Sequence, residues 1–254
     1  MADLSHVIWV GGPAGAGKTT VARRLARRHG LRWYGADTRA WVHRERAAAL
    51  GVPLPDRGPG HDRYERGTMV LDDVRALPNA PLVVVEGDPI LPSLTSAGGH
   101  AVWLWPSREV QRARLEQRHP DGIPPRYLAT WERMSPVFDG PEPVDGELII
   151  VDALDIEATV LAVATALAPT LDAGPRADSV GDRQAMLRYG NQSIIGQYLS
   201  PATKPLTPVS SDVAADFDCE CGRQECRNTV RLRVVDARDL AASGRTAILA
   251  PGHG

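Results

Sequence analysis

The chain has 254 residues, a formal net charge of -2 and a hydrophobic content of 43%. The length allows one large domain, or a medium domain with a small one. The near-neutral charge provides no global field that would recruit nucleic acid or an acidic membrane, so neither is an expected partner. No apolar run approaches the roughly 20 residues of a membrane helix, and the N-terminal residues lack a secretory signal pattern. We therefore expect a cytoplasmic protein.

A glycine-rich stretch follows the first apolar run. Residues 7–10 are typical of a short strand, and 20–29 have the pattern of a helix. Between them Gly12 to Thr20 reads G-P-A-G-A-G-K-T-T, which fits the pattern G-x-x-x-x-G-K-[ST]. Glycines let successive N–H groups point at an anion, and the helix adds the positive end of its dipole. The stretch is therefore predicted to be a phosphate-binding loop.

The residue types of this loop assign roles within it. Lys18 would bring a positive charge to the β- and γ-phosphates of a nucleoside triphosphate, and the Thr19 hydroxyl would be a ligand of Mg²⁺. ATP and Mg²⁺ are therefore the expected cofactors. The predicted nucleotide-binding residues are Gly12, Ala14, Gly15, Ala16, Gly17, Lys18, Thr19 and Thr20.

The elements that follow alternate between strand and helix. Apolar runs predict strands at 7–10, 31–34, 82–85, 101–105 and 147–151. Helical patterns cover 20–29, 38–50, 61–77, 107–119, 127–134 and 155–167. A proline- and glycine-rich loop at 51–60 is expected to act as a flap. This alternation predicts an α/β fold with a five-stranded parallel sheet flanked by helices.

Acidic residues follow two of the predicted strands. Ligands of parallel sheets bind at the carboxyl ends of the strands, where the loop, Asp37 and Glu86 with Asp88 should converge. Asp37 is the candidate that orients or deprotonates a phosphate acceptor; alternatively, Asp37 or Thr38 only caps the helix that follows. Glu86 could hold the water shell of Mg²⁺ or act as the base. Alternatively, Glu86 is only an acidic residue of a surface turn.

Two groups of arginines have separate interpretations. Arg114 and Arg118 lie one helical turn apart before a breaker-rich loop, where they could stabilise a transferring phosphoryl group when a lid closes. The alternative is an ordinary solvated face. The arginines of the first helix, at 23, 24, 27 and 28, are interpreted as a solvated face.

These residues carry a resemblance to a known group of enzymes. The loop at 12–20, Asp37 after the second strand, Glu86-Gly87 after the third and Arg114-Leu115-x-x-Arg118 resemble the nucleoside-monophosphate-kinase-like P-loop kinases. That group includes gluconate, shikimate and chloramphenicol kinases. The resemblance implies a P-loop NTPase fold with a lid and phosphoryl transfer from ATP. It also supports Asp37 as the residue that contacts the acceptor hydroxyl. The whole chain looks most like an actinobacterial group of kinase-like ATPases.

The remaining third of the chain has a different composition. Residues 169–181 are linker-like, 182–199 look helical, and 229–235 look like a strand. The predicted organisation is a kinase-like domain at 1–168, a linker at 169–181 and a small α+β module at 182–254.

All 3 cysteines of the chain lie in this last part. Cys219, Cys221 and Cys226 supply three thiolates close together, and a tetrahedral Zn²⁺ site needs four ligands, for which His253 is the fourth candidate. The Cys-x-Cys cluster, a strand and a final Pro-Gly-His resemble a module found at the C-terminus of many actinobacterial proteins. Reduced cysteines in a turn, or a redox role, are the alternatives. A filled metal site would favour an interaction module that could bind a protein partner.

Two functions fit this sequence. The first is an ATP-dependent kinase that phosphorylates a hydroxyl of a small-molecule acceptor, with Lys18, Asp37, Glu86, Arg114 and Arg118 as its catalytic residues. The second is a nucleotide-dependent switch whose zinc-like module binds a partner.

Overall fold

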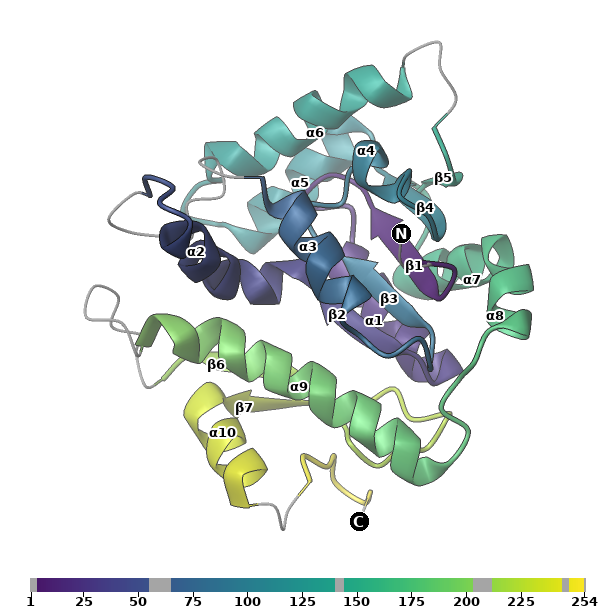
Figure 1. The fold of residues 1–254 in the computed structure, drawn as a ribbon, viewed down its shortest axis with the longest axis vertical. Coiled ribbons are helices and arrows are strands. Elements are labelled where there is room, and N and C mark those ends of the chain that lie inside the picture. Colours follow the sequence, from purple (N-terminus) through teal and green to yellow (C-terminus); the bar gives the residue numbers. More distant parts are fainter. Residues whose placement is uncertain (1–3, 55–64, 140–143, 203–211, 244–246, 254) are drawn as a thin grey trace.

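The computed structural model describes residues 4–54, 65–139, 144–202, 212–243 and 247–253. A parallel five-stranded sheet with the order β2-β3-β1-β4-β5 forms the centre of the molecule, with helices on both faces (Figure 1). Its strands are β1 (Val7–Gly11), β2 (Arg32–Gly35), β3 (Val83–Glu86), β4 (His100–Trp105) and β5 (Glu147–Ile150). The predicted α/β fold and its five strands are therefore confirmed.

Helices connect the strands in the predicted order. They are α1 (Lys18–His29), the 3₁₀ turn η1 (Ala36–Arg39), α2 (Ala40–Ala49), α3 (Arg66–Arg75), α4 (Pro92–Thr95), α5 (Arg108–Arg118), α6 (Pro125–Phe138) and α7 (Ile156–Ala166). The short α4 was not predicted, and α6 continues beyond the predicted end at 134. Most of the predicted flap, at 55–60, and the start of the predicted helix at 61–77 lie outside the described residues. None of the described helices is both long and apolar enough to cross a membrane.

The register of the sheet aligns the ends of its strands. Val10 of β1 and Gly35 of β2 both pair with Glu86, the last residue of β3. These three neighbouring strands therefore end at one edge of the sheet, where the loop after β1 and the turn after β2 begin. β1 and β3 are buried throughout, as continuous apolar strands between two helical layers should be.

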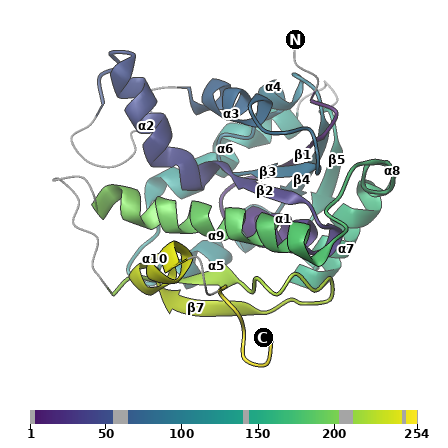
Figure 2. The ribbon, with the colours of Figure 1, turned by 60° about the horizontal axis from the view of Figure 1, so that its bottom comes forward.

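The side chains of the sheet form two separate hydrophobic clusters. Ile8 and Val10 belong to the cluster under α1 and α7, whereas Val7 and Trp9 belong to the cluster that includes residues of α3, α4 and α6. Side chains of a strand alternate between its faces, so one apolar strand supplies both clusters. Figure 2 shows the helical layers on the two sides of the sheet.

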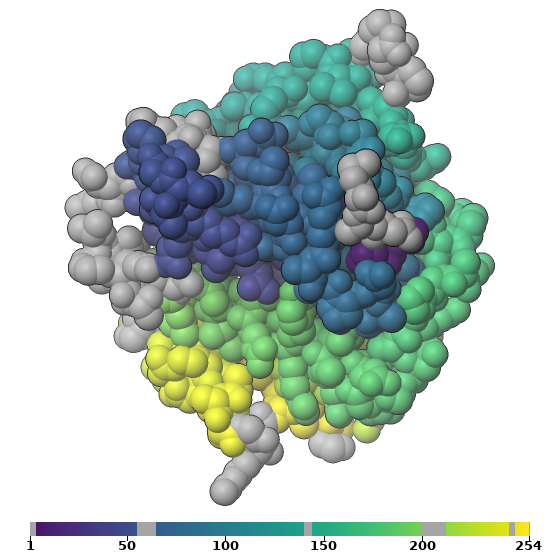
Figure 3. Space-filling view, in the orientation of Figure 1, coloured from purple at the N-terminus to yellow at the C-terminus, as the bar shows by residue number. Residues whose placement is uncertain are grey.

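The C-terminal third packs directly on the first of these clusters. Its elements are α8 (Ala168–Ala173), α9 (Val180–Ala202), β6 (Ala214–Asp218), β7 (Thr229–Arg233) and α10 (Val234–Ser243). Ile194 and Ile195 of α9 and Phe217 of β6 share one buried cluster with Leu25 of α1. On the face drawn in Figure 3, the green segment of α9 runs between the blue segments and the yellow α10.

Several C-terminal elements differ from the prediction. The segment predicted as a linker, 169–181, contains most of α8, and β6 and α10 were not predicted. The predicted strand at 229–235 ends at Arg233, because Val234 and Val235 already begin α10. The domain boundaries at 168 and 182 stay a prediction.

Candidate functional site

The loop between β1 and α1 needs glycine at the fixed positions of the pattern. Gly12 has φ +134, and a Cβ there would lie 2.3 Å from the carbonyl oxygen of Leu104. Gly17, the residue before α1, has φ +95. Residues with side chains rarely adopt these conformations, so the glycines give the loop its curled path.

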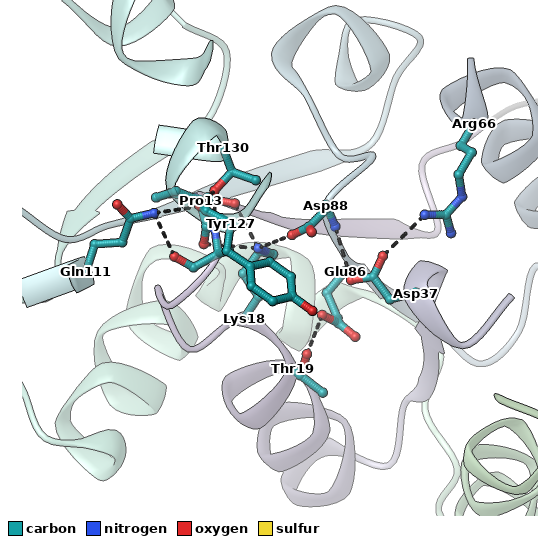
Figure 4. A network of polar contacts seen from close by, with 12 residues as sticks. Pro13, Lys18, Thr19, Asp37, Arg66, Glu86, Asp88, Gln111, Tyr127 and Thr130 are labelled. Carbon is teal, nitrogen blue, oxygen red and sulfur yellow. Dashed lines mark hydrogen bonds and ion pairs between the residues drawn. The ribbon is translucent and has the colours of Figure 1, made fainter. Parts of the chain in front are cut away.

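Lys18 lies across the mouth of this loop. Its side chain is 6% exposed, and its Nζ donates to the carbonyl oxygens of Gly12, at 2.9 Å, and Pro13, at 3.1 Å. The same Nζ lies 3.2 Å from Oδ1 of Asp88 (Figure 4). The ammonium group is therefore fixed between the loop and an acid that follows β3.

Glu86 lies beside the loop at the end of β3. It is 2% exposed, and its Oε2 accepts a hydrogen bond of 2.8 Å from the hydroxyl of Thr19. Burial and, to a smaller extent, the neighbouring Asp37 carboxylate together raise the pKa of Glu86 to about 7, against the opposing effects of Thr19 and Lys18. A hydroxyl and several carboxylate oxygens are the donors that Mg²⁺ prefers, so this group of residues fits the predicted metal.

Asp37 faces the same group from η1. Its Oδ2 accepts from the backbone N–H of Asp88 at 3.3 Å, and its Oδ1 lies 3.5 Å from Nη1 of Arg66. Neither η1 nor α2 has a side-chain cap, so the alternative of Asp37 or Thr38 as a helix cap is wrong. Desolvation, followed by the charge of Asp88, raises the pKa of Asp37.

A tight turn after β3 brings Asp88 to Asp37. Gly87 has φ +136, and a Cβ there would lie 2.9 Å from the Cβ of Ala36. The turn can approach η1 only because residue 87 has no side chain. The close contact explains how two acids from different strands come together at one edge of the sheet.

Arg66 is a site residue that the sequence did not indicate. It begins α3, is 4% exposed, and its Nη2 donates to the carbonyl oxygen of Ala36 at 2.5 Å. Its Nε lies 3.4 Å from Nδ1 of His43, whose Nε2 lies 3.1 Å from Oδ2 of Asp73. A chain of polar groups therefore supports the guanidinium of Arg66 beside Asp37. No sequence motif identifies these contacts.

Helices α5 and α6 hold the other side of the loop. The backbone N–H of Ala14 donates to Oγ1 of Thr130 at 2.8 Å, and Nε2 of Gln111 donates to the carbonyl of Ala14 at 3.0 Å. Ala14 was predicted to bind nucleotide, but in this structure its N–H contacts α6. Neither Gln111 nor Thr130 was predicted, because single amide and hydroxyl residues on helices carry no recognisable pattern.

The two predicted phosphate-binding arginines lie elsewhere. Nη1 and Nη2 of Arg114 donate to the carbonyl oxygens of Gly15 and Val151, at 3.4 and 3.0 Å. Arg118 is exposed at the end of α5. Within the described part of the chain, neither guanidinium contacts the acids of the site.

The three cysteines and His253 come together at the C-terminus. Their candidate ligand atoms all lie within 4.8 Å of one another. Nδ1 of His253 lies 3.5 Å from Sγ of Cys219 and 3.4 Å from Sγ of Cys221 and of Cys226. Zinc bonds of about 2.3 Å to sulfur and about 2.0 Å to nitrogen give a tetrahedral S···N edge of about 3.5 Å. The cluster therefore fits a Cys₃His zinc site.

Neighbouring groups support this geometry. The backbone N–H of Ala250 donates to Sγ of Cys219 at 3.3 Å, an interaction that favours a thiolate. Nε2 of His253 lies 3.2 Å from the side-chain amide of Asn228. If Nδ1 binds a metal, Nε2 carries a hydrogen and the Asn228 oxygen must face it. Such an outer partner fixes the orientation of a ligating histidine.

The arginines of α1 do not form a solvated face, so that interpretation is wrong. Arg24 and Arg28 form ion pairs with Glu157 of α7. Arg23 and Arg27 form ion pairs with Asp218 of β6, and their side chains are 16% and 8% exposed. The acidic partners lie more than 100 residues away in the sequence, so local spacing could not indicate them.

The glycine loop between β1 and α1 and the sheet order define a P-loop NTPase fold. No protein-family model matches the sequence, and no curated protein matches it.

Solved structures similar to this chain include three kinases. A gluconokinase from Sinorhizobium meliloti has 20% identity over 67% of this chain and 95% of its own, with a TM-score of 0.45. A shikimate kinase from Acinetobacter baumannii in complex with shikimate has 20% identity over 64% and 93%, with a TM-score of 0.44. A sugar kinase from a Janibacter species has 23% identity over 65% and 96%, with a TM-score of 0.43. All three TM-scores are below 0.5.

Proposed function

We propose that this protein is a Mg²⁺-dependent kinase that transfers the γ-phosphoryl group of ATP to a hydroxyl of a small molecule. A sugar, a nucleoside-like compound or an antibiotic-like compound would be the acceptor. One observation carries this proposal: Lys18 and Thr19 of the P-loop lie at the same sheet edge as Asp37, Glu86 and Asp88.

The nucleotide side of the reaction follows from the loop. Its curled backbone and the start of α1 would bind the phosphates of ATP. The Nζ of Lys18 would leave its carbonyl partners to neutralise the β- and γ-phosphates. Thr19 would be a protein ligand of Mg²⁺, with Glu86 and Asp88 accepting hydrogen bonds from its water shell. The metal would supply charge neutralisation on the phosphate oxygens.

The acceptor side centres on Asp37. Arg66 and the backbone N–H of Asp88 each hold one of its carboxylate oxygens, which fixes its orientation. Asp37 would accept the proton of the acceptor hydroxyl while the oxygen forms a bond to the γ-phosphorus. The bond from that phosphorus to the β–γ bridging oxygen breaks, and ADP leaves. A raised pKa makes Asp37 a more effective base near neutral pH.

Labelled ATP tests this proposal directly. The protein is incubated with γ-labelled ATP, Mg²⁺ and pools of sugars, nucleosides and hydroxylated antibiotics, and the label is followed by chromatography. We expect label on a small molecule, with a loss of 10²-fold or more in Asp37→Asn, a typical contribution of a general base. Asp72→Asn, an exposed acid on α3, is the matched control and should retain activity.

The switch ATPase makes a different prediction in the same experiment. It would release inorganic phosphate slowly, with no labelled acceptor, and Asp37→Asn would leave that release unchanged. This outcome would contradict the kinase. The roles predicted for Arg114 and Arg118 stay predictions, because they require the lid to bring these residues to the phosphates.

We also propose that the Cys₃His cluster binds a structural Zn²⁺ ion. All four positions would be filled by protein ligands, so the ion would stabilise the local fold and leave no site for a substrate. Metal analysis should find about one zinc per chain in the wild-type protein and a large loss in Cys221→Ser. Equal zinc content in the two proteins would contradict the site. A protein partner for this part of the chain stays a prediction.

A further inference from the structure

One acidic side chain connects the nucleotide-binding helix to the cysteine cluster. Nε of Arg23 lies 3.0 Å from Oδ2 of Asp218, and Nη1 of Arg27 lies 3.0 Å from Oδ1. The two arginines are one turn apart on α1, the helix that begins at Lys18 of the P-loop. All three side chains are at most 16% exposed. Ion pairs shielded in this way interact more strongly than pairs on an open surface.

The partners of α1 lie on both sides of the cysteine cluster. Asp218 directly precedes Cys219, and Nη1 of Arg27 also donates to the carbonyl oxygen of Asn228 at 3.0 Å. Asn228 in turn contacts His253. The α1 helix is therefore attached both to Asp218, the neighbour of Cys219 in the sequence, and to Asn228, which contacts His253.

A second helix holds the same acid in place. The side chain of Asn191 in α9 donates to the carbonyl oxygen of Asp218 at 2.9 Å and accepts from its backbone N–H at 2.9 Å. The same amide donates to Oε1 of Glu220 at 2.9 Å. These buried bonds connect Asp218 and Glu220 to α9, so the position of the Asp218 side chain follows the backbone of residues 218–220.

A bound metal ion would add a further constraint on that backbone. Three thiol groups and an imidazole within 4.8 Å attract one another weakly without an ion, and thiolates repel one another. The two strands β6 and β7 form a hairpin of a kind that has little stability by itself. A bound ion would join the turn at 219–226 to the tail at 247–253 through its four ligands.

We propose that zinc occupancy of the Cys₃His cluster controls nucleotide affinity, because the cluster positions Asp218, and Asp218 holds α1 and the P-loop in their binding position. The inference rests on the zinc site and the nucleotide site proposed above. A crevice lined by Arg23, Arg27, Cys219 and Cys226 adjoins the cluster. Metal loss would then weaken ATP binding without any contact between zinc and the nucleotide.

The first test separates Asp218 from the metal ligands. Asp218→Asn should keep its zinc but bind a non-hydrolysable ATP analogue with Mg²⁺ at least about fivefold more weakly by calorimetry, the lower end of typical allosteric coupling. Asp216→Asn is the matched control, because its exposed side chain pairs with Arg231 on the surface. Unchanged affinity in a zinc-loaded Asp218→Asn protein would overturn the proposal.

The second test needs no variant, so it stays decisive if Asp218→Asn fails to fold. Coupling between two binding sites is reciprocal. The wild-type protein should therefore bind zinc at least about fivefold more tightly when the ATP analogue and Mg²⁺ are present, measured by competition with a chromogenic zinc chelator. Equal zinc affinity with and without nucleotide would overturn the coupling. Absence of zinc, or absence of nucleotide binding, in the wild-type protein would overturn the corresponding earlier proposal and this one with it.

Discussion

At the scale of single residues, the buried Glu86 makes the stability of the protein depend on pH. Its pKa rises from 4.5 to about 7 in the folded chain, mainly because burial disfavours the charged form. Between these values the folded state binds more protons than the unfolded state, so the free energy of unfolding falls as the pH increases from about 5 to about 7. Above pH 7 the buried, ionised Glu86 lowers the free energy of unfolding by about 3 kcal/mol.

Glu86→Gln should remove this part of the pH dependence. We expect the variant to be more stable than the wild type at pH 7.5 and to differ much less at pH 5, measured by urea unfolding without nucleotide. The comparison between the two proteins cancels contributions from histidines and cysteines that titrate in the same range. A stability difference that does not change with pH would contradict the assigned pKa shift.

The sequence predicted the acids of the site better than their partners. Asp37 and Glu86 could be predicted because each follows a strand, and strand ends converge in a parallel sheet. Arg66 could not, because its approach to Asp37 depends on how α3 packs after the segment at 51–65. The arginines of α1 were misinterpreted for a similar reason: their charge is neutralised by Glu157 and Asp218, which only the tertiary fold brings near.

At the scale of elements, α6 is attached to the P-loop through Thr130. This side chain is 5% exposed, accepts from the N–H of Ala14 at 2.8 Å and donates to the carbonyl of Tyr127 at 2.7 Å. Thr130→Val keeps the shape but leaves the Ala14 N–H without this acceptor. We expect a loss of about 1–3 kcal/mol in stability by chemical denaturation, together with weaker ATP binding.

The same helix provides the control for this prediction. Ser135→Ala removes a hydroxyl that bonds Asp139 on the exposed side of α6, and it should change stability by less than about 0.5 kcal/mol. If the two variants lose equal stability, the contact between α6 and the loop contributes nothing specific. A Thr130→Val protein with normal stability but weak ATP binding would show that this contact contributes to nucleotide binding and not to stability.

Element prediction succeeded where periodicity and length were clear. The five core strands are short apolar runs between helical patterns, and these were all found. β6 was missed because Ala214 to Asp218 alternates small, acidic and aromatic residues with little β-branched character. The turn from β7 into α10 was missed because Val234 and Val235 have high strand propensity, which burial of Val234 in the core cluster overrides.

At the scale of the whole molecule, the shared core bears on the predicted division at residues 168 and 182. Ile194 of α9 is 6% exposed and belongs to the same cluster as Leu25 of α1 and Val84 of β3. A core that crosses a boundary couples the unfolding of the two sides. We therefore expect the chain to unfold as one cooperative unit, with the C-terminal third stabilising the P-loop sheet.

Ile194→Ala tests this expectation by amide hydrogen exchange. Truncation of a buried isoleucine costs about 2–5 kcal/mol, and in a single cooperative unit that loss should appear in the amides of β3 as well as in those of β6. Leu161→Ala, on the exposed face of α7 where the leucine is 61% exposed, is the matched control and should leave both strands unchanged. Faster exchange in β6 with full protection retained in β3 would instead support two separately folding domains. In that case the strand β3 would unfold independently of the part of the chain that contains Ile194, so the truncation would not affect its amides.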